Sequence, residues 1–232
     1  MPKINAQVSA HISVGIAPPP LEVYTQPDCP EDGYIWTPGY WAYGSDGYYW
    51  VPGVWVAPPS PGLLWTPPYW GFDGSNYVWY PGYWGTTVGF YGGINYGYGY
   101  SGVGYNGGRW QGGHFYYNTA ISHINNRSIH NTYIDKTVVH NSNNHQSFNG
   151  RGGMNAKPGP QEQAASHNNH VQATALQSSH HQAALQDKNQ FSSHTQMHPA
   201  TTSMDRINGN HFNSMGHAAG GMGGGRGGGG HH

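Results

Sequence analysis

The strongest constraint on the fold of this chain is a short phrase that occurs four times between residues 36 and 84. Each copy runs Trp, any residue, Pro, usually Gly, any residue, Trp, and the copies span residues 36–41, 50–55, 65–70 and 79–84. Eight of the nine tryptophans lie in these hexamers: Trp36, Trp41, Trp50, Trp55, Trp65, Trp70, Trp79 and Trp84. Large apolar side chains are otherwise scarce in this region, so we expect most of these rings to form its core.

The hexamers belong to a longer internal duplication. Residues 35–55 align without a gap on residues 64–84, with Trp, Pro and Tyr recurring at matching positions. A gap-free alignment of this kind indicates one structural unit used twice. Each unit contains two hexamers joined by a polar turn that includes Gly and Asp.

The turn residues predict a β-hairpin in each unit. Asp46-Gly47 and Asp73-Gly74 lie between runs of Trp, Tyr and Val. Gly tolerates positive φ and Asp bonds the turn backbone, which favours tight hairpins. We therefore expect residues 40–43 to pair with 48–51, and residues 69–72 with 77–80.

The Pro-Gly pairs inside the hexamers have two interpretations. As hairpin turns, they would place Trp36 opposite Trp41. L-Pro favours type I and II turns, however, whose twist separates the flanking strands. The third hexamer also has Pro68 where the others have Gly, so positive φ cannot be required there. We favour a bend at each Pro, where the chain leaves one hairpin and enters the next.

Composition excludes several classes of function. Charged residues make up 8% of the chain and the formal net charge is -1. From residue 33 to residue 108 the only charged side chains are Asp46 and Asp73. Nucleic-acid binding needs clustered cations, which this chain lacks. No stretch approaches the roughly 20 apolar residues of a membrane helix, so we predict no transmembrane segment.

The segments after the repeats are less regular. Tyr96, Tyr98 and Tyr100 alternate with Gly, which predicts either a strand with one face of rings and one bare face, or a loose loop. Residues 109–117 predict a further hairpin closed by a Gly pair. Short polar strands follow up to residue 139. We divide the chain into an N-terminal arm and Pro-rich spacer (1–32), a Trp/Tyr/Gly-rich β domain (33–140) and a tail (141–232).

The tail is rich in Gln, His, Asn and Gly. Such a segment buries too little apolar surface to offset an ordering entropy of roughly 1–2 kcal/mol per residue. We therefore predict a disordered tail, with transient helix within residues 161–190.

Catalytic and metal-binding signals are weak. There is no Gly-x-Ser-x-Gly, phosphate loop or His-Glu-x-x-His. The histidines of the β domain, and Asp135 beside them, are expected to be structural or solvated. We predict no enzyme activity and no cofactor. Ten of the 16 histidines follow residue 150, and neutral imidazole binds Zn, Cu and Ni. Weak metal-ligand candidates there are His167, His170, His180 and His181.

Cys29 is the only cysteine, so no disulfide can form within the chain. A free thiol in a Pro-bounded loop is the favoured interpretation, and an intermolecular disulfide is the alternative.

The hexamers, the preceding Gly33-Tyr34-Ile35 and the following Gly-Tyr run of residues 89–98 resemble the bacterial YXWGXW repeat family, also written WXXGXW. The resemblance covers about residues 12–139. The resemblance implies secretion or a place in the cell envelope, and it does not point to any particular activity. We expect that Met1 is an internal start, that a secretory signal precedes it, and that the mature chain begins near Gln7. The location expected is periplasmic, outer-membrane-associated or extracellular.

The fold is predicted to be all-β, an antiparallel hairpin meander or small sandwich. Two functions remain open. The first is a structural or adhesive role, with self-association through Gly-Tyr strand edges. The alternative is a carbohydrate- or peptidoglycan-binding module, because exposed aromatic rings stack on sugars. The candidate binding surface comprises Tyr40, Tyr43, Tyr49, Tyr69, Tyr80, Tyr83, Tyr96, Tyr98 and Tyr100.

Overall fold

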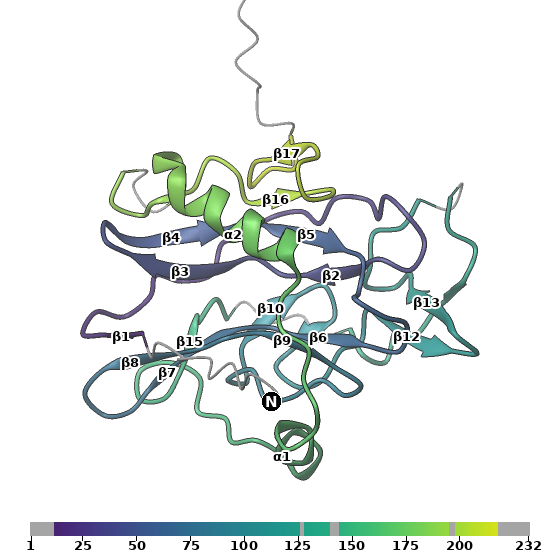
Figure 1. The fold of residues 1–232 in the computed structure, drawn as a ribbon, viewed down its shortest axis with the longest axis horizontal. Coiled ribbons are helices and arrows are strands. Elements are labelled where there is room, and N and C mark those ends of the chain that lie inside the picture. The colour runs from purple at the N-terminus through teal and green to yellow at the C-terminus, as the bar shows by residue number, and fades with distance from the viewer. Residues whose placement is uncertain (1–11, 126–127, 140–143, 195–197, 218–232) are drawn as a thin grey trace, which may run out of the picture.

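Two stacked layers of β-structure form the body of the protein in the computed structural model, which describes residues 12–125, 128–139, 144–194 and 198–217. The first repeat unit lies in one layer and the second unit in the other (Figure 1). The fold is mostly β, as predicted, but it consists of several small sheets and includes two α-helices.

The first unit is a single long hairpin. Its strands are Ile35–Thr37 (β2), Tyr40–Gly44 (β3), Gly47–Val51 (β4) and Gly53–Val56 (β5). The antiparallel pairing of β3 with β4, which places Tyr40 opposite Val51, confirms the predicted hairpin. β2 pairs with β5 in the same register, so Trp36 lies opposite Trp55.

The second unit repeats this arrangement. Its strands are Leu64–Thr66 (β6), Tyr69–Phe72 (β7), Tyr77–Tyr80 (β8) and Tyr83–Gly85 (β9). β7 pairs with β8, as predicted, and β6 pairs with β9, so that Trp65 lies opposite Trp84.

The Pro-Gly pairs are bends and not hairpin turns. Trp36 faces Trp55 and not Trp41, which confirms the bend. The expectation that the chain there enters a different hairpin was wrong, because the register of β3 with β4 continues into β2 with β5. Pro lacks the N–H that a ladder needs, so the hydrogen bonding is interrupted while the pairing continues.

Glycine serves close approach at these bends, not positive φ. A Cβ at Gly39 would lie 2.3 Å from an indole carbon of Trp50, and one at Gly53 would lie 2.6 Å from an indole carbon of Trp36. Neither glycine has positive φ. Each of these two bends therefore provides a bare backbone surface on which the indole from the opposite strand rests.

Two further hairpins follow the repeats. Asn95–Gly97 (β10) pairs with Tyr100–Ser101 (β11), so the Gly-Tyr run reverses direction and does not form one long strand. Gly108–Gln111 (β12) pairs with His114–Asn118 (β13) across a Gly pair, as predicted. Of the short polar strands expected next, the structure contains Thr132–Tyr133 (β14), parallel to β13.

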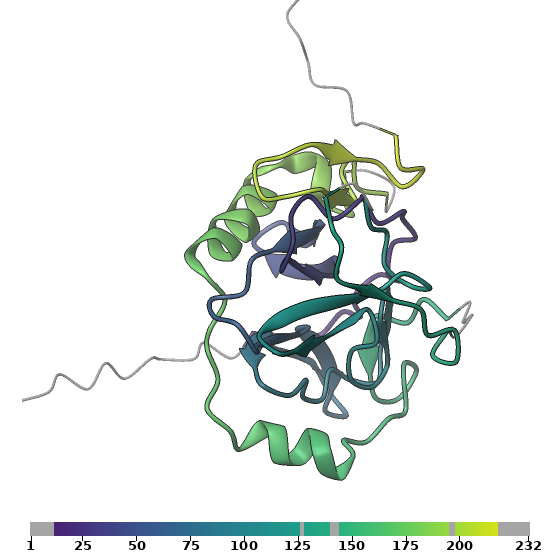
Figure 2. The same ribbon diagram turned by 90° about the vertical axis from the view of Figure 1, so that its right-hand side faces the viewer.

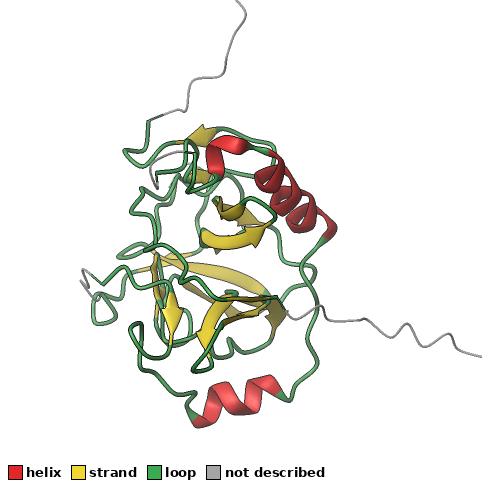
Figure 3. Cartoon of the chain, turned by 90° about the vertical axis from the view of Figure 1, so that its left-hand side faces the viewer, coloured by secondary structure: helices red, strands yellow, loops and turns green. Residues whose placement is uncertain are grey.

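The remaining elements cover the two units. Ser13–Val14 (β1) and Phe148–Asn149 (β15) flank the sheet of β7 and β8, while Ser203–Met204 (β16) and His211–Phe212 (β17) extend that of β2 and β5. The helices are Pro160–Ser166 (α1), Ala175–Gln186 (α2) and the 3-10 helix Lys188–Gln190 (η1). Figures 2 and 3 show α1 and α2 at opposite ends of the body.

The prediction of a disordered tail therefore differs from the structure over residues 144–194 and 198–217. The tail is ordered by apolar burial of Phe148, Phe191 and Met204 and by polar contacts with buried indoles. The Trp84 indole donates to Gln177 Oε1 on α2 at 2.8 Å. The Trp50 indole donates to the Thr202 carbonyl at 3.0 Å. Residues 141–143, 195–197 and 218–232 of the predicted tail lie outside the described residues.

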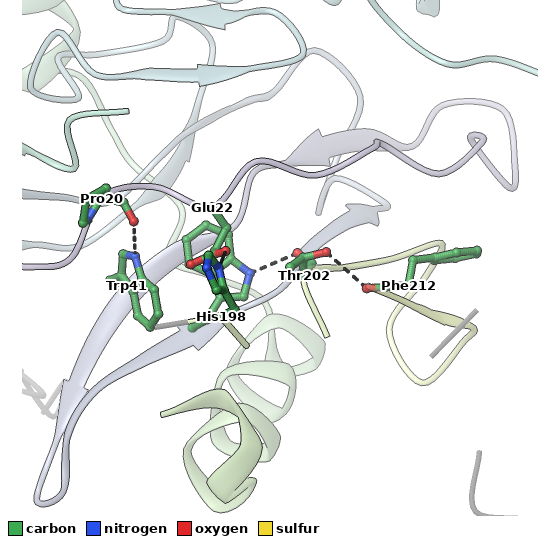
Figure 4. Close-up of polar contacts among 7 residues, drawn as sticks. Pro20, Glu22, Trp41, His198, Thr202 and Phe212 are labelled. Atoms are coloured by element: carbon green, nitrogen blue, oxygen red, sulfur yellow. Dashed lines mark hydrogen bonds and ion pairs between the residues drawn. The ribbon is translucent and has the colours of Figure 1, made fainter. Parts of the chain in front are cut away.

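The N-terminal spacer accepts hydrogen bonds in the same way. The Trp41 indole donates to the Pro20 carbonyl at 2.8 Å (Figure 4). The same figure shows a bond within the tail, in which the Thr202 hydroxyl donates to the Phe212 carbonyl at 3.2 Å. The Trp55 indole donates to the Pro27 carbonyl at 2.8 Å. Because a buried N–H without a partner costs about 1–3 kcal/mol, these carbonyls allow the indoles to be buried.

The core is tryptophan, as predicted. The fully buried repeat tryptophans are Trp36, Trp41, Trp50, Trp55, Trp70 and Trp84, and Trp65 is nearly so. Facing rings pair at centroid distances of 5.0 to 5.4 Å in tilted or edge-to-face geometry. Such pairs add about 0.5–1.5 kcal/mol each beyond their area burial. Trp79 is the exception, because it is only half-buried.

Candidate functional site

An aromatic pocket lies between the second unit and the segment that carries α1. We call it the Tyr80 pocket, and its volume is about 460 Å³. The second unit contributes the bend at residues 81–82 and three tyrosines, Tyr69 of β7, Tyr80 of β8 and Tyr83 of β9. Phe90, in the loop after β9, completes this wall. The opposite wall is made of Pro158, Glu162, Gln163, Ser166, His170 and Gln172.

The aromatic rings of the pocket pack against one another in defined orientations. The rings of Tyr69 and Tyr80 stack at 4.6 Å with an interplanar angle of 6°. Phe90 packs edge-on against Tyr69 at 5.5 Å. Tyr80 is 45% exposed, the most open ring of the repeat units. A directly opposed cross-strand pair on β7 and β8 holds this platform in place.

The polar groups of the pocket come mainly from the α1 segment. Glu162 caps its own helix, because one carboxylate oxygen accepts from the Gly159 N–H at 2.8 Å. Its other oxygen is buried without a hydrogen-bond partner. The His170 ring stacks on Tyr83 at 3.7 Å and lies 2.8 Å from the Ala165 carbonyl. Burial raises the pKa of both Tyr69 and Tyr83, so their hydroxyls stay neutral.

A second cavity, the Trp79 cleft, lies where the bends of both units meet α2. Its volume is about 280 Å³. Prolines from all four hexamers line it: Pro38, Pro52, Pro68 and Pro81. Tyr40 and Trp79 face each other at 5.5 Å. His181 on α2 lies 3.0 Å from the Tyr40 hydroxyl and 2.8 Å from the Tyr49 hydroxyl, which fixes the Tyr40 ring.

The predicted binding tyrosines divide into three groups. Tyr69, Tyr80 and Tyr83 come together in the Tyr80 pocket. Tyr40, Tyr43 and Tyr98 are half-buried elsewhere, and of these only Tyr40 lines the Trp79 cleft. Tyr49, Tyr96 and Tyr100 are buried, which removes them from the predicted surface. The short β10–β11 hairpin turns Tyr96 and Tyr100 inward, whereas His181 of α2 and Phe191 cover Tyr49.

Sequence reasoning missed the second wall of the pocket. Glu162, His170 and Gln172 lie in the tail within residues 161–190, where transient helix was predicted and where the structure has most of α1 and all of α2. Nothing in the repeats points to these three residues. A local signal was present for α2, because Thr174 and Gln177 form a capping box. The residues buried on that helix are Gln177, His180 and Ala184, which lie on one helical face.

The four histidines proposed as weak metal ligands make different contacts. His167 is the C-cap residue of α1 and His170 stacks on Tyr83. His180 and His181 bond the Pro52 carbonyl and the two tyrosines of the first unit. Within the described ranges, no group of three or more His, Cys, Asp or Glu is placed to hold a metal ion.

Two further properties bear on function. Cys29 is buried, with its Sγ 3.2 Å from the Glu31 carbonyl, and burial raises the pKa of its thiol to about 12. Its position removes the basis for an intermolecular disulfide. Among the helices of the described residues, none combines the length and apolar character needed to cross a membrane.

The first unit matches a known repeat. Its two hexamers fit a family model over residues 32–56. These residues are two copies of the WXXGXW repeat. Comparison with curated proteins and with solved structures found no match. In the WXXGXW repeat of this chain, the first Trp of one hexamer pairs with the last Trp of the other, and the Gly provides the surface for an indole.

Proposed function

We propose that this WXXGXW-repeat protein is a non-catalytic, exported glycan-binding protein with an adhesive role in the cell envelope or outside the cell. The Tyr80 pocket is its binding site. The observation that carries the proposal is the stacked Tyr69–Tyr80 pair, of which Tyr80 is exposed, inside a cavity large enough for a sugar ring.

The chemistry of the pocket suits an uncharged sugar. Aromatic faces stack on the C–H faces of sugar rings, while amides, hydroxyls and carboxylates bond ring hydroxyls. Gln163, Ser166 and Gln172 supply such groups at the rim. Among the residues that the structure describes, none that lines the pocket is a Lys or Arg able to pair with a phosphate or carboxylate.

Binding fits this pocket better than cleavage. Glycoside hydrolysis uses two carboxylates that flank the scissile bond. Glu162 is the one carboxylate among the described lining residues, and it already caps a helix through one oxygen. The described residues of the pocket therefore provide a stacking platform without a pair of carboxylates.

Self-association through Gly-Tyr strand edges receives less support. β10 and β11 form a two-stranded hairpin with Tyr96 and Tyr100 turned into the core. In this proposal the protein adheres by binding a glycan polymer of the cell envelope in the Tyr80 pocket.

The binding proposal is tested by titrating the protein with uncharged mono- and oligosaccharides, followed by calorimetry and tryptophan fluorescence. The comparison is between wild type, Tyr80→Ala and the matched control Tyr116→Ala, a half-buried tyrosine outside both cavities. We expect binding by wild type and the control, and a loss of at least tenfold in affinity for Tyr80→Ala. Association of the protein with rising concentration, together with no response to any sugar, would overturn the proposal.

The location is tested by cell fractionation with N-terminal sequencing of the native protein. The resemblance to the repeat family supports export. A mature start near Gln7 outside the cytoplasm is the expected result, and an intact Met1 in the cytosol would contradict it.

A further inference from the structure

Trp79 is the one repeat tryptophan left half-buried, and the sequence of its partner bend explains why. In the first unit, Gly39 lies under the Trp50 indole, so close that a Cβ would come within 2.3 Å of it. Position 68 is the equivalent of position 39, and Trp79 is the equivalent of Trp50. Pro68 carries a ring where the first unit has bare backbone. Trp79 has no glycine to rest on at this bend, and it lines an open cleft together with Pro68.

The Trp79 cleft is walled by a second aromatic platform. The Tyr40 ring lies 5.5 Å from Trp79, and His181 anchors the Tyr40 hydroxyl at 3.0 Å. The rim is polar and uncharged where α2 passes, with the exposed Ser178 and Gln182 among the lining residues. The Trp79 cleft therefore resembles the Tyr80 pocket, because both have aromatic rings in the wall and amide and hydroxyl groups at the rim.

The two cavities adjoin each other. Pro81, Gly82 and Gln172 line both of them. Trp79 and Tyr80 are neighbours on β8, and successive strand residues point to opposite faces. Trp79 therefore serves the cleft between the units and Tyr80 the pocket beneath the second unit. The bend at Pro81 and Gly82 connects the two.

We propose that these cavities are two subsites for one ligand, an unbranched, uncharged oligosaccharide that crosses the bend at Pro81 and Gly82. This inference rests on the proposed function of the Tyr80 pocket and adds chain-length recognition to it. No Lys or Arg of the described part of the chain lines either cavity, which disfavours anionic chains. The glutamines at both rims donate and accept hydrogen bonds, which matches sugar hydroxyls. A polyproline peptide is a poorer match for these glutamines, because proline has no backbone N–H and offers only carbonyl acceptors.

The test is a chain-length series with N-acetylglucosamine and its β-1,4-linked oligomers of two, four and six rings. Affinity is measured by calorimetry for wild type, Trp79→Ala, Tyr80→Ala and the control Tyr116→Ala. For wild type and control we expect at least a tenfold gain from the single ring to the tetramer. Trp79→Ala loses this gain and keeps the affinity for the single ring. Tyr80→Ala weakens binding at every length.

A second measurement guards against a folding defect in Trp79→Ala. In wild-type protein labelled with 5-fluorotryptophan, the ¹⁹F signal of Trp79, assigned with Trp79→Phe, shifts with the tetramer and not with the single ring. Affinity that is independent of length, or an unshifted Trp79 signal, overturns the two-subsite proposal while the Tyr80 pocket stands. Binding of no oligomer overturns both proposals. Tighter binding of a polyproline peptide than of the tetramer shows that the groove takes a peptide and overturns both.

Discussion

The indole nitrogen of Trp70 donates a hydrogen bond of 2.8 Å to the backbone carbonyl of Trp41, the equivalent residue 29 positions earlier. The hydroxyl of Tyr100 lies across the same interface, 3.0 Å from the Trp65 carbonyl and 3.3 Å from its equivalent, the Trp36 carbonyl. Equivalent residues of the two units thus meet each other, and Tyr100 bridges them. The duplication produces an interface as well as two similar hairpins.

Replacing Trp70 with Phe tests this interface. The substitution keeps an aromatic ring but leaves the buried Trp41 carbonyl without the indole donor, so we expect a loss of about 2–4 kcal/mol in the free energy of unfolding. Urea denaturation measures the change. Trp110→Phe is the control, because that half-buried indole bonds the Leu63 carbonyl at 2.9 Å outside the repeat units. Equal losses in the two variants would contradict a special role for Trp70.

The bend glycines give a second prediction. Gly39→Ala places a Cβ 2.3 Å from the Trp50 indole, and such overpacking costs about 1–3 kcal/mol. Gly15→Ala is the control, because its Cβ would have no neighbour closer than 4.0 Å and Gly15 does not have positive φ. Thermal unfolding should show a clear drop for Gly39→Ala and little change for Gly15→Ala. Similar melting temperatures for both variants would refute the packing role of the glycine.

The polar order of the tail is tested at Gln177. Gln177→Ala leaves the buried Trp84 indole N–H without its acceptor and removes half of the α2 capping box. We expect a loss of about 1–3 kcal/mol in the free energy of unfolding. Gln186→Ala changes an exposed position at the other end of the same helix, and it should be nearly neutral. If hydrogen exchange in α2 is equally fast in wild type and Gln177→Ala, the contact does not hold the tail.

Stability is expected to fall in mild acid because of two histidines. Burial lowers the pKa of His180 and of His181 below the usual value of 6.5. The unfolded chain therefore binds protons first as the pH falls, so stability is constant above about 6.5 for these groups and decreases below it. The groups that face them are the Pro52 carbonyl, the Tyr40 and Tyr49 hydroxyls, and His211.

The measurement is the melting temperature between pH 7.5 and pH 5. His180→Gln should flatten the decrease, and His194→Gln, at an exposed position after η1, should leave it unchanged. A decrease of the same size in His180→Gln would show that other groups cause it.

Cys29 gives a chemical prediction. Its thiol is 2% exposed and burial raises its pKa to about 12. Since the thiolate is the reactive form, the native protein should react with a disulfide reagent at pH 8 far more slowly than a free thiol. Denaturation should release one full equivalent. Rapid labelling of the native protein would show that the loop opens readily.

Much of the repeat architecture followed from local signals. The Asp-Gly pairs mark the turns between β3 and β4 and between β7 and β8, because Gly47 and Gly74 adopt positive φ. The Asp73 carboxylate also accepts hydrogen bonds from the Ser75 and Asn76 N–H groups. Pro68 in place of Gly was sufficient to exclude a turn that depends on positive φ. The aromatic core followed from composition, since the β domain has few other side chains large enough to fill it.

The tertiary structure decided the rest. Nothing local to Trp36 shows that it pairs with Trp55, because that contact depends on the register continuing past two prolines. The order of the tail was hidden because Gln177 and Thr202 act through hydrogen bonds to buried indoles, and apolar periodicity does not register such contacts. The Tyr80 pocket was hidden for a related reason. The repeat supplies Tyr69 and Tyr80, but the opposite wall comes from Glu162 and His170, which only the folded chain brings within reach.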